Sequence, residues 1–228
     1  MRDLSKGFTL IEIAIVLVII GLLLGGVLKG QELITGARVR NLISQQDGTR
    51  AAFYGFQDRY RALPGDYATA STNIAGVNVS GDGNGRIDAP NGGGVHEEIL
   101  AWNHLALAGF LNGSYTMANS GVSAPAQGNN PVNPYGVYLT LVYDANWGNG
   151  TTPAKHNLKT GSQVPVEIMA EVDRKVDDGQ PYAGGFQFSV YVPTGFTAPV
   201  ASPNGCISAI SAWDINGGNT NCGGVTLF

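Results

Sequence analysis

Charged residues are scarce in this sequence, and cysteine is scarcer still. Only 13% of the 228 residues are charged, 13 of them basic and 17 acidic, and two residues are cysteines. A protein that binds nucleic acid needs runs of Lys and Arg to neutralise phosphates. No such run occurs, so we expect no nucleic-acid partner. With 43% apolar residues, the chain is also too apolar to be a highly charged disordered protein.

Signature motifs of common enzymes are missing as well. His96, His104 and His156 have no Cys or Glu at the spacings of familiar zinc sites. No GxSxG motif, P-loop or strand-to-helix GxGxxG motif occurs. We interpret the acidic segment 173–178 as a helix end and a turn, with an ion as an option, rather than as a catalytic carboxylate pair. The sequence therefore predicts a protein that is not an enzyme.

The longest apolar run lies close to the N-terminus. Residues 8–28 are apolar apart from Thr9 and Glu12, and at ~1.5 Å per residue they are long enough to cross a hydrocarbon core of ~30 Å. Arg2 and Lys6 precede the run, which favours an N-terminus that stays in the cytoplasm. A secretory signal peptide has a shorter apolar region of roughly 7–15 residues. We therefore expect one membrane-spanning helix rather than a removable signal peptide.

Glu12 is an unusual residue for a membrane span. A carboxylate inside the membrane costs about 2.5–3.5 kcal/mol on insertion scales. Either Glu12 lies near enough to the interface to stay hydrated, or it finds a positive partner within the membrane. The candidate partners are a freed α-amino group and a cation on a neighbouring subunit.

The residues around Glu12 match a family pattern. Residues 6–12, KGFTLIE, followed by the apolar run, resemble the class III leader of type IV pilins and type II secretion pseudopilins. The resemblance implies that a membrane prepilin peptidase cleaves between Gly7 and Phe8 and then methylates the new amino group of Phe8. It also implies that Glu12 neutralises the N-terminal amine of an adjacent subunit during assembly. Asp3 is a mild departure from an all-basic leader.

The resemblance also implies a function in filaments. We expect a structural subunit of a bacterial type IV pilus or pseudopilus, with further copies of itself, prepilin peptidase and the inner-membrane assembly machinery as partners. It would span the inner membrane once before assembly, and then enter an extracellular pilus or a periplasmic pseudopilus. Two alternatives stay open: a minor pilin with an adhesive or priming C-terminal domain, and a membrane-anchored binding domain that never polymerises. Glu12 would have no purpose in the second alternative.

We expect three parts along the chain. The leader is residues 1–7, the N-terminal helix is 8–62 with its membrane and polymerisation segment at 8–28, and an extracytoplasmic globular domain follows at 63–228. Pro64 is the first proline of the chain. Apolar residues in the second half of the helix recur every three to four positions, which predicts that one face packs against the globular domain.

We expect the globular domain to be loop-rich, because the chain has 33 glycines and 11 prolines. Periodicity predicts helices at 96–108 and 166–176 and strands at 135–144 and 186–192. Within the first of these helices, we expect Trp102 to pack inside and His104 to lie on the surface. The predicted fold class is α+β: a long N-terminal helix packed on a loop-rich domain with a small antiparallel sheet, as in type IV pilins.

The glycine-rich loop GDGNGRID places Asp and Asn oxygens at alternating positions. Asp82, Asn84 and Asp88 fit positions 1, 3 and 7 of a calcium loop. The match is partial and the loop is not an EF-hand, so Glu97 or Glu98 would have to supply the missing carboxylate. Two interpretations stay open: a structural calcium site, and a solvated turn without metal.

Cys206 and Cys222 both lie near the C-terminus. A disulfide between them is permitted if this part of the chain lies outside the cytoplasm, and it would stabilise the fold by about 3 kcal/mol. The arrangement resembles the disulfide-bounded C-terminal loop of type IV pilins. The alternative is two unpaired thiols.

Overall fold

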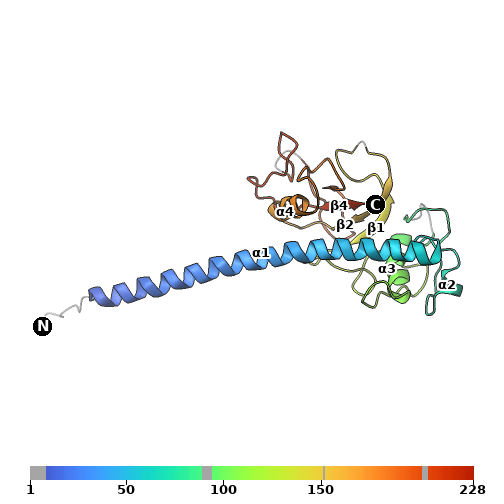
Figure 1. The fold of residues 1–228 in the computed structure, drawn as a ribbon, viewed down its shortest axis with the longest axis horizontal. Helices are drawn as coiled ribbons and strands as arrows, with labels where there is room; N and C mark the ends of the chain where they lie inside the picture. Colours follow the sequence, from blue (N-terminus) through green and yellow to red (C-terminus); the bar gives the residue numbers. More distant parts are fainter. Residues whose placement is uncertain (1–8, 89–93, 151, 202–204) are drawn as a thin grey trace. The chain divides into compact units, whose positions relative to one another are not determined.

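One long helix leads into a domain of short helices and strands (Figure 1). The computed structural model describes residues 9–88, 94–150, 152–201 and 205–228. The elements are, in chain order, α1 (Leu10–Tyr60), α2 (Ala70–Asn73), α3 (Glu97–Leu107), β1 (Thr140–Asp144), β2 (Lys155–Lys159), α4 (Val166–Val176), β3 (Phe186–Phe188) and β4 (Gly224–Leu227).

α1 runs without a break because its sequence holds no helix breaker stronger than glycine. It contains no proline, and it ends where Arg61 adopts a positive φ of 53°, shortly before Pro64. The prediction of a long N-terminal helix is confirmed.

α1 contributes to two compact units. The first unit ends at Arg38, and the second runs from Val39 to Phe228 and holds all the strands and the other helices. None of the described residues of the first unit, 9–38, is buried. The second unit has its own core, and the glycine-rich loop and both cysteines belong to this unit.

Four strands form one antiparallel sheet in the order β1-β2-β4-β3. The C-terminal strand β4 therefore lies inside the sheet, where Val225 faces Lys159 of β2 on one side and Gln187 of β3 on the other. With α1 and this sheet, the predicted α+β fold is confirmed. The strands β1 and β3 are shorter than the segments predicted for them at 135–144 and 186–192.

The face of α1 from Val39 to Phe56 supplies one wall of the core of the second unit. Two polar residues, Gln46 and Thr49, interrupt this apolar face and are nevertheless buried. The hydroxyl of Thr226 on β4 donates a hydrogen bond of 2.7 Å to Gln46 Oε1. Through this hydrogen bond, Gln46 joins α1 to the C-terminal strand β4.

His104 of α3 is buried, and the prediction that it lies on the surface is wrong. Its Nδ1 accepts a hydrogen bond from the Gly65 backbone N–H at 3.0 Å, and its Nε2 lies 3.1 Å from the Val79 carbonyl oxygen, to which it donates. Its ring also stacks on Phe56, with 6.2 Å between centroids. Burial lowers the pKa of His104 to about 4, so it is a neutral structural residue at physiological pH. Trp102 is fully buried, as predicted.

A disulfide joins Cys206 to Cys222 across 16 positions of sequence. Both cysteines are fully buried and belong to the same apolar cluster as α4. Cys222 also pairs with Val164 in an isolated β-bridge, just before α4 begins. The disulfide therefore ties the segment of Cys206 to that of Cys222, and the β-bridge ties the latter to the residues just before α4.

Candidate functional site

Thr9 and Glu12 form a capping box at the start of α1. Glu12 Oε2 accepts hydrogen bonds from the Thr9 backbone N–H at 2.7 Å and from the Thr9 hydroxyl at 2.8 Å, and the Glu12 N–H donates to Thr9 Oγ1 at 3.3 Å. Such reciprocal bonds satisfy amide groups that a helix N-terminus leaves free. The sequence predicts that Glu12 either stays hydrated near the interface or finds a positively charged partner, and it does not predict this contact within the chain. Gly7 and Phe8, the predicted processing site, lie outside the described residues.

From Leu10 to Leu28, apart from Glu12, the helix presents an apolar surface on all sides. Leu10 is 93% exposed, and every large apolar side chain that follows it up to Ile34 is exposed as well. The helix is long and apolar enough over this stretch to cross a membrane. An apolar helix without a polar face is stable only where lipid or other protein covers it.

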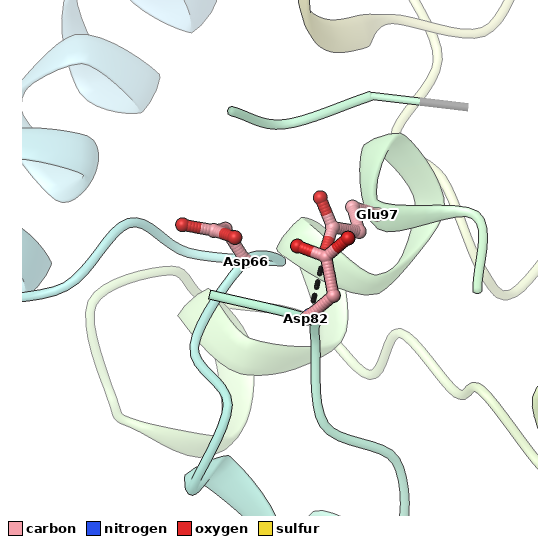
Figure 2. Close-up of side chains that lie close together, drawn as sticks. All are labelled: Asp66, Asp82 and Glu97. Carbon is pink, nitrogen blue, oxygen red and sulfur yellow. Dashed lines mark hydrogen bonds between the residues drawn. The ribbon is translucent and has the colours of Figure 1, made fainter. Parts of the chain in front are cut away.

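Three carboxylates from separate segments lie close together in the second unit (Figure 2). Asp66 belongs to the loop after α1, Asp82 to the glycine-rich loop, and Glu97 is the first residue of α3. One oxygen of each side chain lies within 4.8 Å of the other two. Asp66 and Glu97 are buried, whereas Asp82 is exposed.

Backbone hydrogen bonds hold these carboxylates in place. Glu97 Oε1 accepts from the Asp82 N–H at 2.9 Å, and Asp66 Oδ2 accepts from the Gly85 N–H at 3.0 Å. The Gly83 N–H donates to the Asp66 carbonyl oxygen at 2.9 Å. The glycine-rich loop is therefore fastened to both of its acidic neighbours.

Glycine is required where the segments approach one another. A Cβ atom at Gly81 would lie 2.2 Å from the Gly65 carbonyl oxygen. Gly65 itself has a φ of +90°, and a Cβ atom there would lie 2.4 Å from the Glu97 carbonyl oxygen. His104 fixes the same turn through its hydrogen bond to the Gly65 N–H. The site is thus built on a rigid, buried base.

Burial and mutual repulsion disfavour the charged state of this group. Burial raises the pKa of Glu97 to about 7, and the charges of Asp66 and Asp82 act in the same direction. Burial also raises the pKa of Asp66. Among the described residues, no Lys, Arg or His forms an ion pair with any of the three carboxylates. The negative charge is therefore uncompensated within this part of the chain.

This group differs from the calcium ligands that the loop sequence suggested. Asp82 and Glu97 are in it, Asp66 joins them, and Asp88 does not. Asp88 instead offers its backbone N–H, which lies 3.4 Å from Glu97 Oε2. The side-chain amide of Asn84 donates to Asp82 Oδ2 at 2.9 Å and so orients that carboxylate. Asp66 lies in a turn with no motif spacing to Asp82, and only the fold reveals it.

A second acidic group lies at the end of α4, where Asp173 belongs to the last turn and Asp177 and Asp178 follow the helix. Asp173 accepts a hydrogen bond of 2.7 Å from Trp213 Nε1, and Asp177 Oδ2 accepts one of 2.9 Å from the Phe186 N–H. These contacts fit the interpretation of the segment as a helix end and turn, because each bond connects α4 to a neighbouring segment.

Comparison with known families identifies the N-terminal segment. Residues 2–28 match the family model of the prokaryotic N-terminal methylation motif. The chain thus carries the class III leader of type IV pilins, followed by a long apolar helix, and over this N-terminal segment it is similar to prepilins of the pilin or pseudopilin type. No curated protein and no solved structure matches the chain.

Proposed function

We propose that the protein is a structural subunit of a bacterial type IV pilus or pseudopilus. Prepilin peptidase removes residues 1–7, methylates the amino group of Phe8, and leaves Glu12 as the fifth residue of the mature chain. The observation that carries the proposal is the methylation motif at 2–28 together with a helix whose large apolar side chains are all exposed from Leu10 to Ile34. A filament core of packed N-terminal helices would cover that surface.

Glu12 gives assembly its direction and register in this proposal. In a single subunit its carboxylate is bonded to Thr9 alone, within the described residues, and carries no ion pair. Docking beside another subunit would place the carboxylate next to the methylated ammonium group of Phe8 of that subunit. Two charges that are costly in an apolar environment would then neutralise one another.

The apolar helix occupies two environments in succession, first the lipid of the inner membrane and then the core of the filament. Before assembly the subunit spans the inner membrane once, with its apolar helix in lipid and the second unit outside the cytoplasm. The inner-membrane assembly machinery then moves the helix from lipid into the filament, so that the same surface exchanges lipid contacts for contacts with other subunits.

Processing provides the test of the proposed function. The chain is expressed in a host that makes prepilin peptidase, and the N-terminus of the membrane-bound and filament fractions is determined by sequencing and mass spectrometry. We expect a mature chain that begins at Phe8 and carries one added methyl group. Gly7→Leu should leave the uncut precursor in the membrane.

The matched control is Gly21→Leu in the same apolar segment, where no atom lies within 4 Å of an added Cβ. This variant should be cleaved normally, since it leaves the leader intact. A chain that still begins at Met1, or one that is cut near Gly26, would exclude processing as a prepilin.

A further inference from the structure

Asp66 has a buried oxygen that makes no hydrogen bond. Only 5% of the residue is exposed, and its Oδ2 accepts from the Gly85 N–H. Its Oδ1 is buried and has no hydrogen-bond partner in the part of the chain that the structure describes. Buried polar atoms are nearly always satisfied, so an unpaired carboxylate oxygen among other acidic groups indicates a positively charged ligand.

We propose that Asp66, Asp82 and Glu97 together bind one divalent cation, and that this cation is Ca²⁺. Oxygen ligands of Ca²⁺ lie about 2.3–2.6 Å from the ion, so ligands on opposite sides of it are about 5 Å apart. The three carboxylate oxygens, all within 4.8 Å of one another, fit around one such ion. The proposal does not depend on the proposed function, because it concerns the second unit alone.

The chemistry of the donors selects the metal. All three side chains offer carboxylate oxygens, which suit hard cations, and no imidazole or thiolate belongs to the group. Mg²⁺ needs near-ideal octahedral geometry with oxygens at about 2.0–2.1 Å, whereas Ca²⁺ accepts irregular arrangements. Carboxylates fixed to three separate backbone segments fit the tolerant ion better.

Solvent reaches the group from the side of Asp66 and Asp82. Asp82 is exposed, and a pocket of about 360 Å³ is lined by Asp66 and the glycine-rich loop. Arg61 also lines this pocket, but its guanidinium lies 3.4 Å from Asp58 Oδ1 in an exposed pair. An ion can therefore enter without displacing a buried side chain.

A bound ion would join three parts of the second unit. It would connect the loop that follows α1, the glycine-rich loop and the first residue of α3, between which the Asp82 and Gly85 N–H groups already donate hydrogen bonds. Calcium should therefore stabilise the second unit against unfolding, with the sub-millimolar to millimolar affinity that is typical of extracellular calcium modules.

The test uses the full chain in detergent micelles, stripped with EDTA and transferred to metal-free buffer. CaCl2 or MgCl2 is then added, and binding and thermal unfolding are followed by titration calorimetry and circular dichroism. We expect Ca²⁺ at several millimolar to raise the Tm by roughly 3–8 °C. Mg²⁺ at the same concentration should raise it less.

Three variants remove one charge each while they keep the shape of the side chain: Asp66→Asn, Glu97→Gln and, at an exposed position that does not endanger folding, Asp82→Asn. Each should lose most of the calcium-dependent rise in Tm. Asp66→Asn and Glu97→Gln should also unfold at a higher temperature than the wild type without metal, because a buried repulsion is relieved. A carboxylate that served only as a hydrogen-bond acceptor would not give this reversal.

Asp178→Asn in the second acidic group is the matched control and should keep the full calcium effect. The absence of any calcium-dependent heat and Tm shift in the wild type would overturn the proposal. A calcium effect that persists in all three variants, or that Asp178→Asn abolishes, would also overturn it, because the ion would then bind elsewhere.

Discussion

The described large apolar side chains of the first unit are exposed, whereas many of those in the second unit form a buried core. Up to Arg38, no described residue is buried, and the apolar side chains point outward around the whole helix. From Val39 onward, the same helix turns one face into a core shared with α3, α4 and the sheet. The second unit buries an apolar core of its own, whereas the apolar side chains of the first unit need lipid or other subunits to cover them.

Carboxylates in the two units show the same difference. Glu12 belongs to the exposed helix, and the positive partner proposed for it comes from another subunit. Glu97 is buried in the second unit, and the partner proposed for its group is a metal ion. In both units a negative charge without a cation in the described chain points to something that binds there.

Phe56→Ala should have the largest effect on stability, and this effect should be confined to the second unit. Phe56 is fully buried and contacts the rings of Tyr60, Tyr67, His104 and Phe110. Its loss should cost about 3–5 kcal/mol of the unfolding free energy of the second unit. Denaturant unfolding measures the loss, and leader cleavage should continue as in the wild type.

The control for Phe56→Ala is Leu24→Ala in the first unit, where the side chain is exposed. It should leave the unfolding of the second unit unchanged. If Leu24→Ala destabilised that unit as much as Phe56→Ala does, the division of the chain into two independent units would be wrong.

Removal of the disulfide should have the next largest effect, again on the second unit alone. The double variant Cys206→Ala/Cys222→Ala should lose about 3 kcal/mol, because the unfolded chain regains the freedom of a loop of 16 positions. A thermal scan with and without reductant measures this loss. Reductant should lower the Tm of the wild type and leave that of the double variant unchanged. An unchanged Tm in wild-type protein whose thiols have been shown to be reduced would contradict the structure.

Acid should weaken the second unit through His104. Its pKa is lowered from 6.5 to about 4 in the folded state, so between these values the unfolded chain binds a proton that the folded chain excludes. Stability from this residue is therefore present above pH 6.5 and is lost as the pH falls toward 4, by about 2–3 kcal/mol at pH 4.5.

Other buried groups titrate in the same range, and Asp173, whose pKa burial raises to about 6, acts in the opposite direction. The measurement is therefore the difference in unfolding free energy between wild type and His104→Gln at pH 7 and at pH 4.5. The wild type should lose more than the variant on acidification. Equal losses would mean that the pKa of His104 is not lowered in the folded state.

Elements with strong local patterns could be predicted from the sequence. α4 has regular apolar spacing and a proline before it, and α1 combines a continuous apolar run with a spaced apolar face and a proline after it, so their positions follow from these patterns. β2, with the sequence KHNLK, has no alternation of apolar residues, and β4 is only four residues long. These two strands exist because the sheet supplies their partners, which a local pattern does not show.

The same limit applies to the site residues. Glu12 and the leader stand in a contiguous motif, so the sequence reveals them. Asp66 and His104 acquire their surroundings from segments far away in the chain, which a local pattern does not show. For Asp82, the sequence suggests Asn84 and Asp88 as companions and Glu97 or Glu98 as a further carboxylate. The fold brings Asp66 and Glu97 into one group with it, and Asn84 hydrogen-bonds to it, whereas Asp88 is not in the group.

Helix capping and assembly are two separate tasks that Glu12 could perform. Glutamine can replace glutamate in a capping box, so Glu12→Gln keeps the hydrogen bonds to Thr9 and removes only the charge. Thr9→Val does the reverse, because it removes the hydroxyl and leaves the carboxylate. This pair of variants isolates the charge at residue 12.

The yield of sheared, pelletable filaments, relative to mature protein retained in the membrane, is the most direct test of whether the N-terminal helix polymerises through Glu12. Wild type, Glu12→Gln and Thr9→Val are expressed at equal levels and compared. We expect all three to be inserted and cleaved, Thr9→Val to form filaments, and Glu12→Gln to remain largely in the membrane, because the adjacent ammonium group would be left uncompensated. A normal filament yield from Glu12→Gln would contradict the account and would favour a membrane-anchored domain.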